Sequence, residues 1–360
     1  MKCTDNYEEQ SYYTEREWAR IQKREQEEKK KQYHLVLVLA ALFLVTSLLV
    51  FLVYYFVLRS HDYTLFLPYN NADTVLGTGN RIFGADQAEP FAQDLCVVSG
   101  DVNPSGAAIS SYSAAVFDLN DEQVLYAKDI FTKRGEASIT KIMTALVTLK
   151  YGNLDDLVTV TATARDIEEG SSVCDIKEGD VLSLRQLLYG LLIASGNDAG
   201  MMIAEHVGGS VENFVAMMNE EAAALGATST HFTNPHGLTD PDHYTTVYDI
   251  YLMFREAMKY DVFMDIISRT NYYAEYSRYD GSPVAVTWES TNHYFTGLAE
   301  APDDIVIYGG KTGTTEEAGA CLALLAKDLY GNPYLSIILH SGSKDSLYEE
   351  MNQLLSLIKN

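Results

Sequence analysis

Three short motifs along this 360-residue chain combine serine hydroxyls, lysine amines and an amide that could act together as a nucleophile and its proton-handling partners. They are Ser-Ile-Thr-Lys at 138–141, Ser-Gly-Asn at 195–197 and Lys-Thr-Gly at 311–313. A serine hydroxyl is a weak nucleophile until a base removes its proton, and a neutral lysine amine can be that base. The residues therefore predict a serine nucleophile with lysine-assisted proton transfer.

Ser138 and Lys141 stand three residues apart at the predicted start of a helix, so their side chains lie on one face. The positive end of the helix dipole favours negative charge on the serine oxygen there. Lys141 can act as a base only if its pKa falls from about 10.4, through burial and a second cation nearby. Lys311 is the expected second cation.

The other two motifs are expected to supply a proton relay and a substrate-binding strand. Ser195 would pass a proton to a leaving amine, and Asn197 would hold a substrate amide. Lys311, Thr312 and Gly313 lie on a predicted strand whose glycines let a peptide backbone approach its edge. Lys311 and Thr312 would then bind the terminal carboxylate of that peptide.

Each motif also has an ordinary structural explanation. Ser138 could be a helix N-cap, the Ser-Gly-Asn stretch a turn between helices, and the Lys-Thr-Gly stretch a strand end. The same patterns recur at 341–344, 356–359 and 290–292. Context and order, rather than the motifs alone, must therefore support the interpretation.

The elements around the motifs predict an α+β fold. Two strand-like runs flank an Asn-Asp turn as a β-hairpin, and apolar residues at helical spacing follow across 138–150. A largely helical middle contains a capping box of Ser183 with Gln186. Three strand-like runs, IVIYGGKT, GACLALLAK and PYLSIILH, precede a last helix at 346–358. A single sheet built from both chain ends, with a helical lobe inserted between them, satisfies this order.

Residues 35–58 contain no charged side chain. At about 1.5 Å per residue this segment can span a hydrocarbon core of about 30 Å. No small-residue cleavage pattern follows it, so we expect an uncleaved anchor and not a signal peptide. Lys29, Lys30 and Lys31 precede the segment closely, and only Arg59 follows it closely. The positive-inside rule then predicts a single-pass protein of the cell membrane, with a cytoplasmic N-terminus and an extracytoplasmic domain.

This interpretation divides the chain into four segments. They are a charged cytoplasmic tail at 1–34, the transmembrane anchor at 35–58, a stalk at 59–104 and a catalytic domain at 105–360. The formal net charge of −24 arises after the tail, because residues 1–34 hold as many basic as acidic side chains. A strongly acidic domain argues against a nucleic-acid partner.

The cysteines give no sign of a metal or cofactor. Cys3 precedes the anchor, and Cys96, Cys174 and Cys321 follow it. Three is an odd number, so at least one of these later cysteines lacks a partner within the chain. Neither a Cys-x-x-Cys pair nor a His/Cys cluster is present. We therefore predict no metal and no cofactor.

Longer stretches around the motifs resemble the serine D-alanyl-D-alanine carboxypeptidases of the low-molecular-mass penicillin-binding protein class. The similar segments are EASITKIMTAL, IASGNDAG, HFTNPHGL, STNHYF and GGKTGTTEEAGACL. The similarity covers roughly residues 91–360. It implies a β-lactamase/penicillin-binding transpeptidase-like fold, with a five-stranded antiparallel sheet beside a helical lobe, here preceded by one transmembrane helix.

The resemblance also implies a reaction. Ser138 would attack the carbonyl of the penultimate D-alanine in a peptidoglycan stem peptide, D-alanine would leave, and water would release the shortened stem. Lys141 and Ser195 would be the other catalytic residues, and the amides of Ser138 and Thr314 would form the oxyanion hole. β-Lactams would acylate Ser138 as slow substrates. The expected substrate-binding residues are Asn197, Lys311, Thr312, Gly313 and Thr314. His236, within HFTNPHGL, is expected to be structural.

Two other functions remain open at this point. A β-lactamase shares the same motif types, although its usual Ser-Asp-Asn motif and glutamate loop have no convincing counterpart here. A non-catalytic cell-wall scaffold could keep the same fold. Rapid hydrolysis of benzylpenicillin would indicate the first, and failure to form a covalent β-lactam adduct would indicate the second.

Overall fold

The computed structural model describes residues 95–358 and a few positions before them. The earlier positions are Lys23, residues 27–31, Leu42, Leu44, Thr46 and Ser47. The predicted tail and anchor, and the stalk up to residue 94, therefore lie outside the described residues apart from these positions. Within the described residues, no helix is long and apolar enough to cross a membrane. The chain divides into two compact units, 1–87 and 88–360, and the fold below is that of the second.

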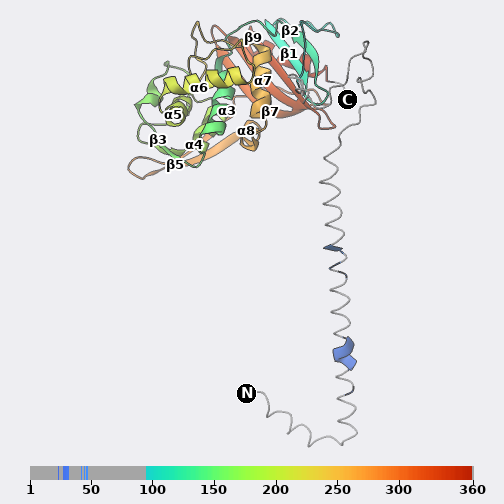
Figure 1. The fold of residues 1–360 in the computed structure, drawn as a ribbon, viewed down its shortest axis with the longest axis vertical. Coiled ribbons are helices and arrows are strands. Elements are labelled where there is room, and N and C mark those ends of the chain that lie inside the picture. Colours follow the sequence, from blue (N-terminus) through green and yellow to red (C-terminus); the bar gives the residue numbers. More distant parts are fainter. Residues whose placement is uncertain are drawn as a thin grey trace, which may run out of the picture. The chain divides into compact units, whose positions relative to one another are not determined.

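A five-stranded antiparallel sheet forms the centre of this unit (Figure 1). Its strands, in spatial order, are β2 (Gln123–Lys128), β1 (Ser113–Asp118), β9 (Pro333–Ser341), β8 (Gly319–Lys327) and β7 (Val306–Thr315). β1 and β2 are the predicted hairpin, and β7 to β9 are the three strands predicted near the C-terminus. The two ends of the domain join because β1 pairs with β9. This arrangement leaves β7, which carries the Lys-Thr-Gly motif, at an edge of the sheet.

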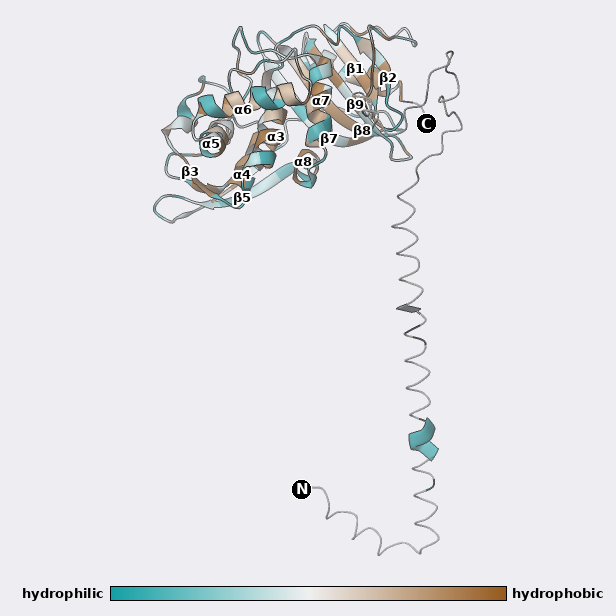
Figure 2. Ribbon diagram, viewed as in Figure 1, coloured by the Kyte–Doolittle hydropathy of each residue, from teal (hydrophilic) through white to brown (hydrophobic). Residues whose placement is uncertain are grey.

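The sheet has an apolar core on each face, because successive side chains of a strand point to opposite sides. Ala115 and Phe117 of β1 belong to the core that contains α7 (Val247–Ala257). Ala114 and Val116, which alternate with them, belong to the core that contains α10 (Lys344–Leu355). Apolar residues accordingly concentrate along the strands and the helices beside them (Figure 2).

The helical lobe is inserted between β2 and β7. Its other helices are α3 (Lys141–Tyr151), α4 (Leu184–Ile193), α5 (Asn197–Gly208), α6 (Val211–Ala224), α8 (Asp261–Ile267) and α9 (His293–Thr296), with 3-10 turns η3 (Ala137–Thr140) and η4 (Ala162–Arg165). α3 contacts α4, α5, α6 and α7, so it is the central helix of the lobe. The helix predicted over 138–150 is present, but its first residues form the 3-10 turn η3, which continues into the buried helix α3.

A second antiparallel sheet lies in the lobe, and the sequence patterns did not predict it. Its four strands, in spatial order, are β3 (Leu157–Thr159), β4 (Val181–Ser183), β5 (Asn271–Ser277) and β6 (Pro283–Glu289). β3 and β4 have three residues each, which is too short for a recognisable alternation. The expectation of a single sheet was therefore incomplete.

The predicted capping box starts the helix that leads to the second motif. The Ser183 hydroxyl accepts from the Gln186 N–H at 3.1 Å, and the Gln186 side-chain oxygen accepts from the Ser183 N–H at 2.9 Å. α4 then runs as an apolar helix to Ile193, and α5 begins at Asn197. Ser195 lies in the short corner between the two helices, as the sequence predicted.

Candidate active site

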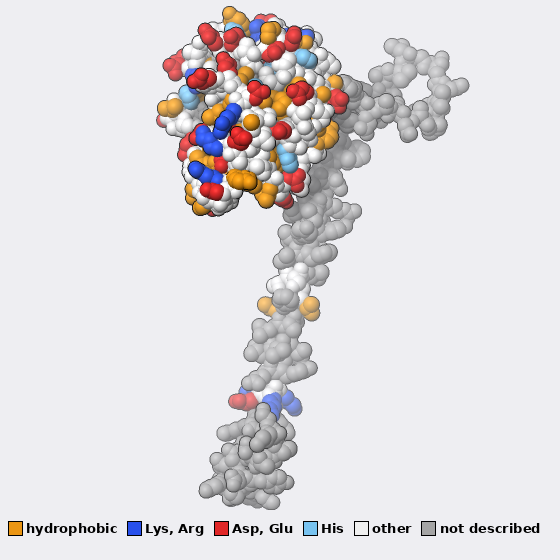
Figure 3. Space-filling model, turned by 90° about the vertical axis from the view of Figure 1, so that its left-hand side faces the viewer, with side chains coloured by type: hydrophobic (Ala, Val, Ile, Leu, Met, Phe, Trp, Pro, Cys, Tyr) orange, Lys and Arg blue, Asp and Glu red, His pale blue; other side chains and the backbone are white. Residues whose placement is uncertain are grey.

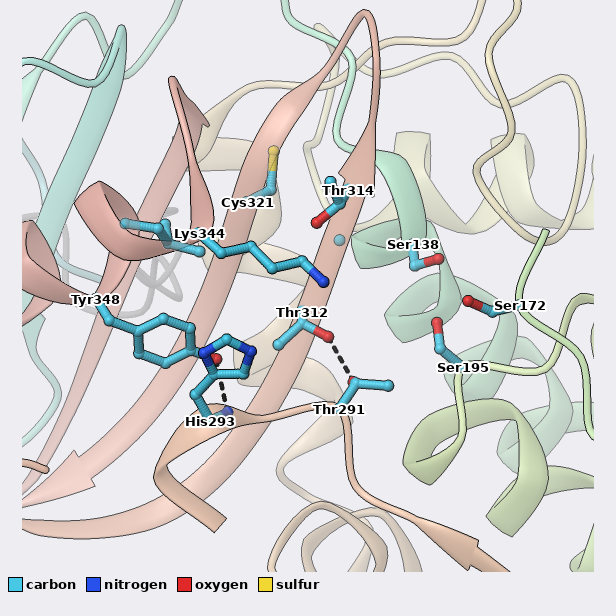
Figure 4. A pocket seen from close by; sticks show the side chains of 12 residues that line it. Ser138, Ser172, Ser195, Thr291, His293, Thr312, Thr314, Cys321, Lys344 and Tyr348 are labelled. Atoms are coloured by element: carbon cyan, nitrogen blue, oxygen red, sulfur yellow. Dashed lines mark hydrogen bonds between the residues drawn. The ribbon is translucent and has the colours of Figure 1, made fainter. Parts of the chain in front are cut away.

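The three motifs meet at one pocket between the edge strand β7 and the helical lobe (Figure 4). Ser138 and Ser195 line it from the lobe, and Thr312, Gly313 and Thr314 line it from β7. The cavity has a volume of about 100 Å³. The other motif residues, Lys141, Asn197 and Lys311, are buried beside it. The order of the motifs in the sequence thus becomes a single site in space.

The Lys141 amine is placed to act as a base toward Ser138. Its Nζ lies 2.8 Å from the Ser138 Oγ, 2.7 Å from the Asn197 side-chain oxygen and 2.7 Å from the His236 carbonyl oxygen. A neutral amine has two N–H donors and one lone pair. The donors match the Asn197 and His236 oxygens, which leaves the lone pair for the Ser138 hydroxyl.

The surroundings of Lys141 also favour its neutral form. The side chain is fully buried. Burial lowers the pKa of Lys141 well below its ordinary value, and the Lys311 ammonium lowers it further. Burial lowers the pKa of His236 to about 3, so its ring stays neutral beside Lys141. The second cation that the sequence called for is therefore Lys311.

Lys311 is paired with Ser195 and does not line the pocket. Its Nζ donates to the Ser195 Oγ at 3.0 Å and to the Thr312 carbonyl at 2.9 Å. The side chain is buried, and burial lowers the pKa of Lys311 to about 7. The carboxylate contact predicted for Lys311 stays a prediction, and the observed contact is with the proposed relay serine.

The backbone is strained at both serine motifs. Ala137, just before Ser138, has φ +50°, and Ser195 has φ +60°. For residues with a Cβ this left-handed conformation costs about 1–2 kcal/mol each. Gly313 makes the first turn possible, because a Cβ there would come within 2.7 Å of the Glu136 carbonyl oxygen. The close packing of β7 at Gly313 therefore holds the turn at Ala137 in its strained conformation.

The glycine of the second motif leaves room for a loop that walls the pocket. A Cβ at Gly196 would lie 2.3 Å from the Cys174 sulfur. Asp198 holds the same loop by accepting from the Cys174 N–H at 2.8 Å. Asn197 donates its backbone N–H to the Ser172 carbonyl at 2.8 Å. The Ser172 side chain consequently stands at the pocket near Ser138 and Ser195 (Figure 4).

The opposite wall contains a lysine and a histidine that sequence reasoning did not assign to the site. Lys344, at the start of α10, extends toward Thr312 (Figure 4). The His293 ring stacks on Tyr348 with centroids 4.6 Å apart. Burial and then Lys344 lower the pKa of His293.

The sequence did contain signals for this wall. His293 falls in the STNHYF segment, where the motif pattern recurs, and Lys344 ends one of the recurring Ser-x-x-Lys patterns. Thr291, inside the recurring Ser-Thr-Asn, also lines the pocket and shares a 2.5 Å hydrogen bond with Thr312. Spacing alone could not show that these repeats reach the same cavity.

No metal centre is evident in the part of the chain that the structure describes. That part contains no group of three His, Cys, Asp or Glu residues placed to hold an ion. Cys96, Cys174 and Cys321 are all buried free thiols. The pocket itself is lined by the hydroxyls of Ser138 and Ser195, the Lys344 side chain, the His293 ring and Cys321.

Replacing Lys311 with methionine tests the burial of its amine. Its pKa is lowered from 10.5 to about 7, so between about pH 7 and 10 the unfolded chain binds one more proton than the folded chain. The contribution of Lys311 to the free energy of unfolding therefore increases with pH in this range. In Lys311→Met we expect the slope of the unfolding free energy against pH to be less positive, by at most about 1.4 kcal/mol per pH unit. Urea unfolding at several pH values measures this slope.

Thr312→Val is the matched control for that experiment, because it alters the same strand without removing a titratable group. It should keep the slope of the unmodified chain. Equal slopes for Lys311→Met and the unmodified chain would contradict the lowered pKa of the buried Lys311 amine.

The chain is similar to known proteins over the region that forms this pocket. The family model described as D-alanyl-D-alanine carboxypeptidase matches residues 101–342. The D-alanyl-D-alanine carboxypeptidase DacF of Bacillus subtilis is 35% identical over 244 residues, which cover 66% of this chain and 59% of the relative. A D-alanyl-D-alanine carboxypeptidase of a Streptomyces strain is 32% identical over 234 residues, covering 62% of this chain and 77% of the relative.

Solved structures agree with this similarity. The crystal structure of a Streptomyces DD-transpeptidase superposes with a TM-score of 0.65 at 29% identity, covering 70% of this chain and 97% of that one. The fold is thus the penicillin-binding, transpeptidase-like fold. With a family match across two thirds of its length and the motif residues assembled at one pocket, the chain belongs to the D-alanyl-D-alanine carboxypeptidase family.

Proposed function

We propose that this protein is a membrane-anchored serine D-Ala-D-Ala carboxypeptidase that removes the terminal D-alanine from peptidoglycan stem peptides. The observation that supports this most directly is the 2.8 Å contact between the Lys141 Nζ and the Ser138 Oγ. The burial of Lys141 and the lowered pKa of its amine make that contact suitable for proton abstraction. β-Lactams are the expected covalent inhibitors at the same serine.

The first half of the reaction forms an acyl-enzyme. Lys141 takes the Ser138 hydroxyl proton while the oxygen attacks the carbonyl carbon of the penultimate D-alanine. The N–H groups of Ser138 and Thr314 receive the developing oxyanion. When the carbon–nitrogen bond breaks, the Ser195 hydroxyl gives its proton to the departing amine and is reprotonated from Lys141. Lys311, which donates to the Ser195 oxygen, holds that hydroxyl in place.

The second half of the reaction uses water. Lys141 takes a proton from a water molecule while the water oxygen attacks the ester carbon. The bond to Ser138 then breaks, and the serine oxygen recovers the proton. The shortened stem leaves as a carboxylic acid that gives up its proton to the solvent, and both residues return to their starting states.

The pocket offers a cation for the carboxylate of the departing D-alanine. Lys344 lines the cavity with Thr312, whereas Lys311 is buried below it. We therefore propose that Lys344 and Thr312 contact the carboxylate, in place of the Lys311 contact predicted from the sequence. Acidic side chains spread across the visible face of the domain (Figure 3), which supports a partner other than nucleic acid.

The Ser138→Ala chain tests the nucleophile. It should form no covalent adduct with benzylpenicillin by intact mass, because the attacking oxygen is gone. Release of D-alanine from a diacyl-lysyl-D-Ala-D-Ala peptide should fall by at least about 1,000-fold. Ser356→Ala is the control, since that serine begins one of the recurring Ser-x-x-Lys patterns but lies on the exposed end of α10.

Other outcomes of that experiment point to other functions. An adduct that turns over rapidly in the unmodified chain would indicate a β-lactamase. A folded, unmodified chain that gives neither adduct nor D-alanine would indicate a non-catalytic scaffold.

The Lys344→Met chain tests recognition of the carboxylate. It should raise the KM for the free-acid peptide by about tenfold, because a charge-assisted hydrogen bond is lost. The same peptide ending in a D-alanine amide should be affected far less. Lys327→Met, at the distal end of β8, is the control. Equal losses with both peptides would contradict a contact between Lys344 and the carboxylate.

The membrane anchor is part of the proposal and rests on the uncharged segment 35–58 with lysines before it. In spheroplasts producing the full chain, a membrane-impermeant maleimide should label Ser60→Cys. In the unmodified chain it should label Cys3 only after permeabilisation, because Cys3 is expected on the cytoplasmic side. The three cysteines of the domain are buried and should not react in either case. Labelling of Cys3 in intact spheroplasts would contradict this topology.

A further inference from the structure

A buried cluster of polar side chains lies behind the nucleophile. It comprises Glu136, Thr140 and His243, and we call it the Glu136 network. Glu136 is 1% exposed, Thr140 2% and His243 6%. Glu136 and His243 line a different cavity, of about 490 Å³, and not the pocket that contains Ser138. The steps proposed above make no use of these residues.

The hydrogen bonds of the network fix which ring nitrogen of the histidine donates. The Thr233 N–H donates to His243 Nδ1 at 3.0 Å, so in the neutral ring the hydrogen is on Nε2. Nε2 lies 3.0 Å from Glu136 Oε1 and 2.8 Å from Thr140 Oγ1. The one Nε2 hydrogen of His243 is therefore shared between the Glu136 and Thr140 oxygens.

The hydroxyl of Thr140 connects this network to the backbone of the nucleophile. It lies 2.8 Å from the Ala137 carbonyl oxygen and 2.9 Å from Glu136 Oε1. Its single proton cannot fully serve both acceptors. With His243 donating to Glu136, the Thr140 proton is free for the Ala137 carbonyl, which belongs to the peptide bond whose N–H is that of Ser138.

That peptide bond is closely packed on two sides. Ala137 has φ +50°, and its carbonyl oxygen would be 1.9 Å from a Cβ at Gly237, while the Ser138 N would be 3.0 Å from a Cβ at Gly313 of β7. The preceding peptide is also held, because the Glu136 carbonyl accepts from the Ile139 N–H at 3.2 Å. Rotation of this peptide would reorient the Ser138 N–H, one of the two proposed oxyanion donors.

The network is a poor way to stabilise the fold. The second carboxyl oxygen of Glu136, Oε2, is buried and has no hydrogen-bond partner among the residues that the structure describes. Burying such an oxygen opposes folding, and an apolar side chain of similar size would avoid that cost. The buried Glu136 carboxylate opposes folding and lies beside the strained Ala137–Ser138 peptide. Such a combination is expected where the local geometry serves the reaction.

We propose that Glu136 and His243 are positioning residues that act through Thr140 to hold the Ala137–Ser138 peptide, and with it the oxyanion-binding N–H of Ser138. They touch neither the pocket nor the substrate. The role rests on the proposed acyl transfer at Ser138 and explains how the strained turn before that serine keeps its orientation.

Glu136→Leu and Glu136→Gln separate positioning from folding. The measurement is the rate constant of acylation by benzylpenicillin as a function of its concentration, with active sites counted by intact mass. In Glu136→Leu the limiting acylation rate should fall about 10–100-fold, because an oxyanion donor is misaligned. The concentration for half-maximal rate should change less than about twofold. Glu136→Gln keeps the Oε1 acceptor and should stay within about threefold of the unmodified chain.

Thr140→Val and Thr140→Ser provide a second, independent pair. Thr140→Val deletes the connecting hydroxyl and should lose acylation rate as Glu136→Leu does, whereas Thr140→Ser should recover it. Glu317→Gln is the control. Glu317 is exposed and lines the same cavity as Glu136 and His243, so this variant should be acylated at the rate of the unmodified chain. Thermal unfolding reports whether each variant is folded.

The proposal is wrong if folded Glu136→Leu or folded Thr140→Val acylates within about threefold of the unmodified chain. If Glu136→Leu does not fold, the Thr140 pair decides alone. Failure of the underlying acyl transfer would look different, since the unmodified chain itself would then form no adduct.

Discussion

Burial of two lysine amines beside two serines is the constraint on which the rest of the site depends. Lys141 and Lys311 have almost no exposed surface, so each loses the hydration that keeps a lysine charged. Burial is the main cause of the lowered pKa of both amines, and for Lys141 the neighbouring Lys311 adds to it. The oxygens that receive their hydrogens are therefore needed to keep the two amines buried, because an unpaired amine at this depth would be too costly.

Those oxygens come from separate parts of the domain. Asn197 starts α5, His236 belongs to the segment after α6, and the two serines lie at the strained corners of the lobe. The glycines of the motifs permit this convergence, since a Cβ at Gly196 or Gly313 would collide with its neighbours. The site thus requires β7 and the lobe to close on each other, and that closure is what removes water from the lysines.

The sequence predicted best those elements that depend on contacts between residues close together in the chain. The β1–β2 hairpin, the Ser183 capping box and the strands β7 to β9 depend on local patterns, and the structure contains all of them. The second sheet was not predicted. β3 and β4 are three-residue strands, and the pairing of β4 with β5 joins distant segments. β5 and β6 form a local hairpin of seven-residue strands, which the pattern analysis overlooked. The roles of Lys344 and Glu136 were not predicted, because only tertiary packing places Lys344 in the pocket and Glu136 behind it.

Residue types and local spacing were enough to identify the reactive groups and the family to which they belong. Ser138 with Lys141, Ser195 with Asn197, and the Lys-Thr-Gly strand could be recognised because spacing within one turn or strand fixes their side-chain directions. The contacts that these groups make depend on how distant segments pack together. The tertiary structure assigned Lys311 to Ser195, brought Lys344 to the pocket wall and placed the Glu136 network behind the nucleophile. Burial and charge coupling act between residues far apart along the chain, so no local spacing could have specified them.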